Sequence, residues 1–345
     1  MNGRITNHIS KMDGTIKTFI YEIIGVEDMI EITNLWKGYD KTNVLQDVNL
    51  TVGRGEIHGL IGENSAGKTT LIKCATGVYK PDQGEILYDG KPVYDNPEVK
   101  TRIGYVADYN DYISIYTVSR MVNMYEVLYP LFDRDKFNTL NEIFKIPVNK
   151  RVFSLSKGQK MRLAFMLETA KKPDYLILDE PTSGLDPLAK SHFFELLINE
   201  VEQNDIGVLI SSHNLEGLER ICDSVTMLHQ GKVEHQMSME NMKGQLTRLN
   251  VVFEGGACKA VYDMPEILRI SNVGSIYTLI VRDFDESLVT RLKKNGAGLV
   301  EPLDISLEEL FVVLEETKEK EADRKKQRDA KTVDDEGKSR KGETA

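Results

Sequence analysis

The stretch Gly62-Glu63-Asn64-Ser65-Ala66-Gly67-Lys68-Thr69-Thr70 matches the pattern G-x-x-x-x-G-K-[ST]. An apolar run at 57–61 precedes it and predicts a buried strand, and residues 70–75 predict a helix. In that context, backbone N–H groups at the helix N-terminus point at a bound phosphate. Lys68 offers a positive charge to the β- and γ-phosphates, and the Thr69 hydroxyl suits Mg²⁺. The stretch therefore predicts a nucleotide-binding loop rather than a glycine-rich turn that binds nothing.

Bulk composition narrows the classes of protein. The chain has 345 residues and a net charge of −10, which predicts one large or two modest domains and argues against a nucleic-acid partner. Its cysteines, Cys74, Cys222 and Cys258, are far apart and odd in number, which argues against a disulfide framework or a zinc site and fits a reducing cytoplasm. No apolar run approaches the roughly 18 residues of a membrane span. We expect a soluble chain whose membrane role, if any, needs a partner.

The hydrophobic pattern predicts the main domain. Residues 1–28 carry no clear pattern and are expected to form an N-terminal extension, so that the main domain runs from 29 to 236. Antiparallel strands are expected before the nucleotide loop, with a turn at 40–43, and a helical subdomain at about 110–170. Apolar strands at 175–178, 208–210 and 225–228 alternate with helical patterns at 188–203 and 215–221. This alternation predicts an α/β core built on a parallel sheet.

The composition changes after Glu240. Strands at 249–253 and 276–281 and a helix at 286–295 predict a small α+β domain at 237–316. Ser306 and Glu309 have the spacing of a capping box and predict the start of one more helix. Residues 317–345 mix charges of both signs with almost nothing apolar, which is typical of a disordered tail.

Two further stretches narrow the chemistry. Asp179 and Glu180 end a continuously apolar strand, at the edge of the sheet where such folds bind ligands. Asp179 is expected to hold Mg²⁺ and Glu180 to activate the attacking water. The alternative without a catalytic role is a solvated acidic turn. Residues 155–159, with Ser156, Gly158 and Gln159 ahead of a helix expected at 160–170, predict a second anion site or a simple N-cap.

These stretches, together with 183–186 and His213, stand in the order of an ABC-type ATPase, and the chain resembles the nucleotide-binding subunit of ABC transporters over about 29–234. The resemblance implies a P-loop NTPase cassette: a mixed α/β sheet core with an antiparallel β subdomain and a helical subdomain. The segment 306–311 also resembles the C-terminal segment of ABC-2-type exporter ATPases.

The resemblance implies a role for each matching residue. Residues 62–70 would bind ATP, with Lys68 also catalytic and Thr69, Asp179 and Asp108 as ligands of Mg²⁺. Tyr39 would stack on adenine, and Ser156, Gly158 and Gln159 would meet the nucleotide held by the other subunit. Asp186 would cross the dimer interface, and His213 would contact the γ-phosphate and the catalytic water. Without the resemblance, Tyr39 would more often be a core residue and His213 an ordinary histidine at a strand end.

Three positions depart from the family pattern. Ser65 stands where glycine is usual, so the backbone is expected to be strained there. Lys157 stands in the middle of LSKGQ, where the family has LSGGQ. Asp108 stands where a glutamine is expected that senses Mg²⁺ and couples to the membrane partner.

The combined pattern favours a transport motor, of the exporter type. A second copy or a sister subunit would form the dimer, a membrane permease would dock near 117–129, and the chain would lie in the cytoplasm on the inner face of the membrane. The alternatives are an ABC-type ATPase that acts on ribosomes or DNA and a regulator with a dead site. The single cassette and the acidic charge argue against the former, and the presence of Lys68, Asp179, Glu180 and His213 argues against the latter.

Overall fold

The computed structural model describes residues 28–40, 42–109, 114–213, 215–241, 246–253, 255–313 and 316. The expected extension at 1–28, except Asp28, and the expected tail at 317–345 lie outside the described residues, as does Lys41 of the predicted turn. The chain divides into two compact units between Met239 and Glu240. Within the described residues, no helix is both long enough and apolar enough to cross a bilayer.

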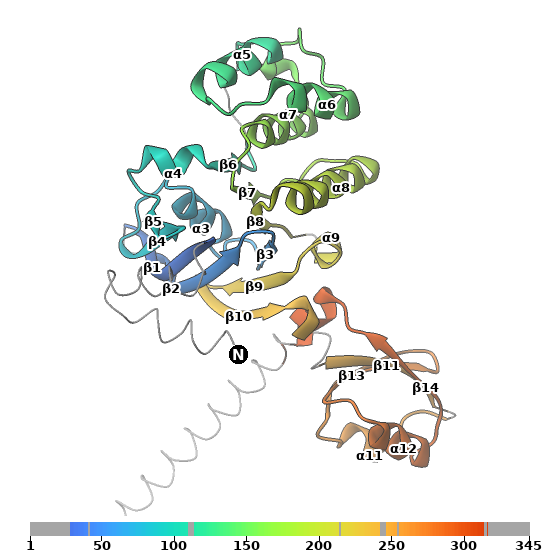
Figure 1. Ribbon diagram of the computed structural model, residues 1–345. Helices are drawn as coiled ribbons and strands as arrows, with labels where there is room; N and C mark the ends of the chain where they lie inside the picture. The colour runs from blue at the N-terminus through green and yellow to red at the C-terminus, as the bar shows by residue number, and fades with distance from the viewer. Residues whose placement is uncertain are drawn as a thin grey trace, which may run out of the picture. The chain divides into compact units, whose positions relative to one another are not determined.

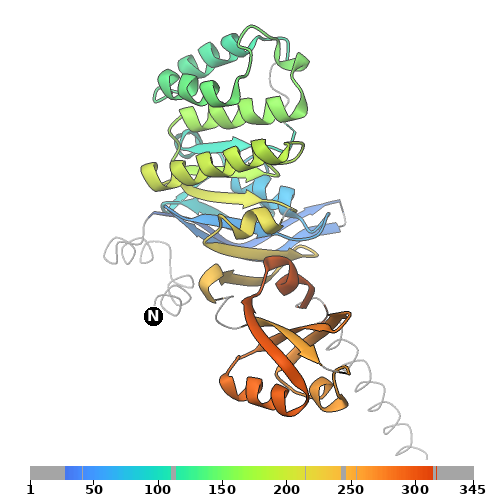
Figure 2. The same cartoon turned by 90° about the vertical axis from the view of Figure 1, so that its right-hand side faces the viewer.

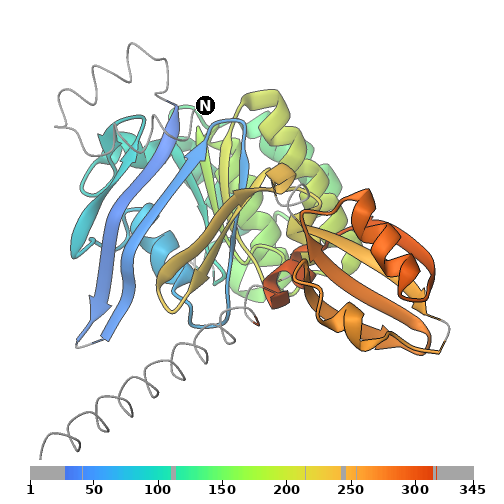
Figure 3. The same ribbon diagram turned by 90° about the horizontal axis from the view of Figure 1, so that it is seen from below.

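An antiparallel sheet opens the first unit. Its spatial order is β2 (Thr42–Gly53), β1 (Met29–Tyr39), β4 (Gln83–Tyr88) and β5 (Lys91–Pro92). β1 and β2 run side by side as long strands (Figure 3), with Ile30 paired to Val52 and Ile32 to Leu50 on the buried face. The turn predicted at 40–43 is too long, because β2 already begins at Thr42. This sheet is the antiparallel subdomain that the sequence predicts.

A mixed sheet carries the nucleotide loop. Its spatial order is β10 (Lys232–Ser238), β9 (Ser224–His229), β3 (Ile57–Ile61), β8 (Gly207–Ser211), β7 (Tyr175–Asp179) and β6 (Ile103–Val106). The strands β9 to β6 are parallel, and every residue of β3, β7 and β8 is buried, as continuous apolar runs predict. Ser211 is in register with both Leu60 and Asp179, so the carboxyl ends of β3, β8 and β7 meet at one edge.

Helices connect these strands. They are α3 (Lys68–Ala75), α4 (Pro97–Thr101), α8 (Pro187–Asn204) and α9 (Leu215–Glu219), and a further group comprises α5 (Val118–Leu128), α6 (Arg134–Phe144), the 3-10 turn Val152–Ser154 and α7 (Lys157–Ala170). Figures 1 and 2 show α5, α6 and α7 gathered at one end of the unit, beyond the edge strand β6. The helix predicted at 160–170 begins three residues too late, because Ser156 caps α7 at Lys157.

The second unit has the order β-α-β-β-α-β. Its elements are β11 (Leu246–Phe253), α11 (Lys259–Tyr262), β12 (Ile267–Val273), β13 (Ile276–Arg282), α12 (Glu286–Lys294) and β14 (Ala297–Asp304). The antiparallel sheet has the spatial order β12-β13-β11-β14, which is the ferredoxin-like arrangement, and α11 and α12 lie on one face of it (Figure 1). The predicted capping box is confirmed, since Glu309 N–H donates to Ser306 Oγ and Ser306 N–H to Glu309 Oε2, each at 3.1 Å.

Candidate nucleotide-binding site

The nucleotide loop, residues 62–70, passes from β3 to α3 in a conformation that requires glycine. Gly62 and Gly67 have φ angles of 155° and 106°. A Cβ atom on Gly62 would lie 2.2 Å from the carbonyl oxygen of Leu228, so no side chain fits there. Ser65 has a φ of 71°, which confirms the expected strain at this position. The loop is therefore held in a tight shape by its neighbours, with backbone strain left at one serine.

Lys68 is folded back into this loop. Its Nζ donates hydrogen bonds to the carbonyl oxygens of Gly62, at 2.6 Å, and Glu63, at 3.0 Å. The side chain is 8% exposed, and burial lowers the pKa of the ammonium, while the negative charges of Glu180 and Asp179 act to raise it. Lys68 thus already spans the loop, close to the carboxylates at the end of β7.

Asp179 is buried at the end of β7. Burial raises the pKa of its carboxyl group, while hydrogen bonds from the hydroxyls of Ser211 and Thr69 act to lower it. Ser211 Oγ donates to Asp179 Oδ1 at 2.7 Å and accepts from the Glu180 N–H at 3.1 Å. Ser211 was not predicted as a site residue; its place at the end of the strand before His213 was the available signal. Thr69 and Asp179, predicted as metal ligands, do lie together.

Glu180 leaves the strand in the left-handed conformation, with a φ of 50°. This turn directs its carboxylate toward the end of β8, where Glu180 Oε2 lies 2.7 Å from His213 Nδ1 and accepts from the His213 N–H at 3.3 Å. The His213 side chain is 67% exposed, whereas that of Glu180 is 16% exposed. The two residues predicted to handle the attacking water therefore contact each other beside the buried Asp179.

The segment 155–159 forms the start of α7. Ser156 Oγ accepts from the Gln159 N–H at 3.2 Å, and Gln159 Oε1 accepts from the Ser156 N–H at 3.1 Å, a complete capping box. Ser156 is exposed and Gly158 is buried; a Cβ atom on Gly158 would lie 3.1 Å from the carbonyl oxygen of Gly184. Within one chain, the N-cap interpretation of this segment is correct, and its exposed hydroxyl stays available to another molecule.

Other predicted residues lie around this centre. Tyr39, at the end of β1, is 43% exposed; its hydroxyl interacts with Thr70, and burial of the phenol raises its pKa. Asp186 is the N-cap of α8 and accepts from the Ala189 N–H at 3.0 Å. Glu63 and Asn64 are exposed at the tip of the loop, and Ala66 is buried. Asp108, which is predicted to be a ligand of Mg²⁺, forms an ion pair with Lys157: its Oδ1 lies 2.7 Å from the Lys157 Nζ.

The donor atoms fit a hard cation. A threonine hydroxyl and a carboxylate are oxygen ligands of the kind that Mg²⁺ shares with phosphate oxygens and water. The part of the chain that the structure describes has no cluster of three or more histidine, cysteine, aspartate or glutamate side chains arranged for a metal. A magnesium site here would therefore be completed by the nucleotide, as is usual for nucleotide-bound magnesium.

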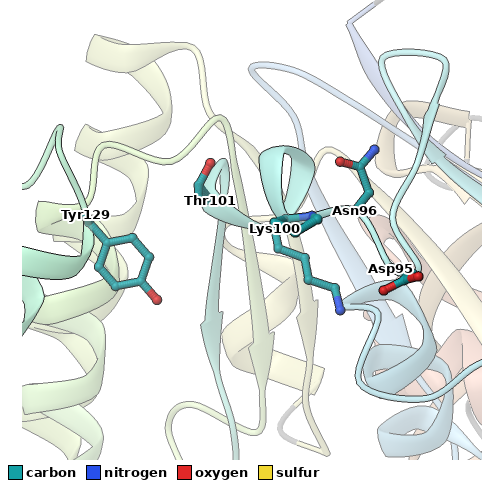
Figure 4. A pocket seen from close by; sticks show the side chains of 6 residues that line it. Asp95, Asn96, Lys100, Thr101 and Tyr129 are labelled. Atoms are coloured by element: carbon teal, nitrogen blue, oxygen red, sulfur yellow. The ribbon is translucent and has the colours of Figure 1, made fainter.

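A groove lies between α4 and the end of α5. Lys100 and Thr101 of α4 line it on one side and Tyr129, the C-cap of α5, lines it on the other (Figure 4). A neighbouring hollow shares Lys100 and Tyr129 and is also lined by Tyr105 and by Tyr109, which is 70% exposed. The groove thus joins the edge of the mixed sheet to the helical group, at one end of the predicted docking segment 117–129.

Comparison with known proteins identifies relatives of this chain. The family model described as "ABC transporter" matches residues 45–183. The ABC transporter ATP-binding protein YtrB of Bacillus subtilis is 32% identical over 284 residues, which cover 82% of this chain and 97% of that protein.

Solved structures show the same fold. One described as the ATP-binding subunit of an ABC transporter has a TM-score of 0.58 and 30% identity, over 62% of this chain and 92% of that one. A bacterial ABC transporter cassette solved as a dimer has a TM-score of 0.57 at 23% identity, over 61% of this chain and 98% of that one. The predicted fold class, a P-loop cassette with antiparallel and helical subdomains, is confirmed. This chain belongs to the ABC transporter ATP-binding proteins, a family of nucleotide-binding subunits that hydrolyse ATP.

Proposed function

We propose that two copies of this chain, or this chain and a sister subunit, bind ATP between the nucleotide loop of one and the segment 155–159 of the other. The observation that carries the proposal is the contact of Glu180 with His213 beside the buried Asp179, at the strand ends that adjoin the nucleotide loop. The exposed cap at Ser156 supports the second half of the site, because it offers a hydroxyl to a neighbouring molecule.

Each residue has a role in this reaction. Residues 62–70 cradle the phosphates, Lys68 contacts the β- and γ-oxygens, and Tyr39 stacks on the adenine. Glu180 orients and deprotonates the attacking water, and His213 holds that carboxylate and contacts the γ-phosphate. Thr69 and Asp179 would hold Mg²⁺, which would neutralise charge on the phosphates. Asp186 faces the partner across the interface.

The dimer would drive a membrane permease. Closing on ATP and opening after hydrolysis would move the helical group, and the groove between Lys100 and Tyr129 would receive a segment of the permease. The exposed aromatic Tyr109 and the docking segment 117–129 adjoin this groove. Such a role places the chain in the cytoplasm, on the inner face of the membrane.

Export is the direction we propose. The capping box at Ser306 and Glu309 supports it, because this segment carries the resemblance to exporter ATPases. In inside-out vesicles that contain the chain and its permease, ATP added outside is expected to load a medium component into the lumen, as read by mass spectrometry. Accumulation only in right-side-out vesicles loaded with ATP would indicate import instead.

The variant Glu180→Gln tests the catalytic assignment. The amide keeps the size of the side chain but cannot accept a proton, so ATP should still bind while turnover falls by about 10²–10⁴-fold. The bound nucleotide should then hold a stable dimer, measured by light scattering with Mg-ATP.

A matched control is Glu195→Gln on α8, whose carboxylate contacts only Ser191 among the interactions described for it. We expect its turnover to equal that of the wild type. Normal hydrolysis by Glu180→Gln would refute the assignment of the base. A variant that stays monomeric in Mg-ATP would refute the sandwich of two copies, and one that also stays monomeric with its sister subunit would refute the proposed sandwich.

Docking is tested by crosslinking. Photoreactive side chains at Tyr109 and Tyr129 in native membranes should capture a polytopic membrane protein. The same probe at Lys232, an exposed residue at the start of β10, is the control and should not capture it. Capture from β10 alone would move the docking surface away from the groove.

A further inference from the structure

The Lys157 side chain joins parts of the site that are far apart in the sequence. Its Nζ donates to Asp108 Oδ1 at 2.7 Å and to Ser183 Oγ at 3.0 Å. Asp108 lies in the loop after β6, Lys157 is the first residue of α7, and Ser183 lies in the turn after β7. The Ser183 N–H donates to the Glu180 carbonyl oxygen at 3.0 Å, so this turn begins at the proposed catalytic residue. One ammonium group therefore connects α7 to the loop after β6 and to the Glu180 turn.

Asp108 adds a negative charge that acts on the buried carboxyl group of Asp179. Its carboxylate is one of the groups whose negative charge raises the pKa of Asp179, as that of Glu180 also does. Both charges therefore act on Asp179, at the place where a nucleotide would bring several more negative charges. Lys157 brings the only ammonium that the structure places within hydrogen-bond distance of Asp108 in the described residues.

We propose that Lys157 is a positioning residue for the nucleotide site: it neutralises Asp108 and holds the loop after β6 against the turn that starts at Glu180. The inference rests on the proposed function. The lysine and the aspartate are also two of the three departures from the family pattern, and their charges cancel. The two departures therefore form one compensated pair rather than two separate losses.

Thermal stability is not the main effect of this pair. Both side chains are 48% exposed, and exposed ion pairs contribute little to the free energy of unfolding. We expect a larger effect on the affinity for an anionic ligand, and the two residues should change that affinity in opposite directions. Without the lysine, Asp108 repels the phosphates; without the aspartate, Lys157 attracts them.

The test is a double-mutant cycle on the full chain, with Lys157→Gln, Asp108→Gln and the double variant. The dissociation constant of ATP is measured by calorimetry with EDTA, so that neither Mg²⁺ nor hydrolysis contributes. We expect Lys157→Gln to weaken binding about fivefold, Asp108→Gln to strengthen it to a similar degree, and the double variant to bind within about twofold of the wild type. High salt should shrink both single effects.

A contact that only supports the structure would give a different pattern, because both single variants would then weaken binding. That result, or a double variant as weak as Lys157→Gln, would overturn the proposal. If a glutamine variant does not fold, as seen in its melting curve, Lys157→Met and Asp108→Asn replace the glutamine variants.

The exposed pair Glu126–Arg134 serves as a matched control. Its side chains are 48% and 38% exposed, and it joins α5 to the start of α6, away from the nucleotide loop. Glu126→Gln and Arg134→Gln should leave the affinity for ATP unchanged. Failure of the wild type to bind ATP would refute the proposed function, whereas normal wild-type binding with single variants of equal sign would refute only the role of Lys157.

Discussion

The loop at 62–70 and the segment at 155–159 each lie at a helix N-terminus that we propose to face the nucleotide, yet they are built differently. The loop is closed: Lys68 is buried and bonded to two carbonyl groups of its own loop, and Gly62 is pressed against the carbonyl of Leu228. The segment is open: Ser156, which forms the capping box with Gln159, is an exposed residue.

This difference indicates which half of the proposed site a single chain completes. The loop lies in one folded unit with the ammonium of Lys68 and the proposed metal ligands Thr69 and Asp179, so it should bind ATP alone. The segment has one hydroxyl and the N-terminus of α7, which is a weak anion site without a second set of contacts. Variants in the two places should therefore affect affinity and dimerisation separately.

The largest effect is expected from Lys68→Ala. Loss of a charged donor to the phosphates should weaken ATP binding about 100-fold, equivalent to about 2.7 kcal/mol. Titration calorimetry measures this change. Lys73→Ala, in the same helix, removes an ammonium that lies over the Tyr79 ring and should leave the affinity unchanged. An unaltered dissociation constant for Lys68→Ala would contradict the proposal that the loop binds ATP through Lys68.

An intermediate effect is expected from Ser156→Ala. The monomer should bind ATP normally, while the ATP-dependent dimer, measured in the Glu180→Gln background, should weaken about tenfold. The variant also loses the cap of α7, worth about 1 kcal/mol. Thr117→Ala is the control, because it removes the N-cap of α5 without touching the segment. If both variants weaken the dimer equally, the effect comes from lost helix stability, and the open half has no direct role.

The smallest effect is expected from Ser65→Gly. Glycine adopts a φ of 71° without a Cβ clash, so the variant should gain about 0.5–1 kcal/mol in stability and keep its affinity for ATP. Lys145→Gly relieves a similar conformation, at a φ of 53°, in the C-cap of α6 and should give a similar rise in Tm. A rise for Lys145→Gly with none for Ser65→Gly would show that the loop compensates the strain.

Local patterns predicted the loop and the strands that carry the candidate nucleotide site. The motif at 62–70 and the apolar runs of β3 and β7 can each be recognised within a short stretch of sequence. The strain expected at Ser65 is also local, and its positive φ confirms it. The contact of Glu180 with His213 could have been predicted, because the parallel strands β7 and β8 have their carboxyl ends side by side.

Contacts between distant segments could not be read from the sequence. Lys157 and Asp108 are 49 positions apart and meet only because α7 packs on the strand that leads to Asp108. In the second unit, β12 and β14 lack a clean alternation: most residues of β12 are half-exposed, and β14 contains Pro302 and several polar residues. Their place as the two edge strands explains both the weak pattern and why it was missed.

The position of Lys68 also affects the thermodynamics of nucleotide capture. Lys68 is buried, and the carbonyl oxygens of Gly62 and Glu63 accept hydrogen bonds from its ammonium in place of solvent. The dehydration cost of this cation is thus met when the chain folds, and the incoming phosphate has only to exchange one set of oxygen partners for another.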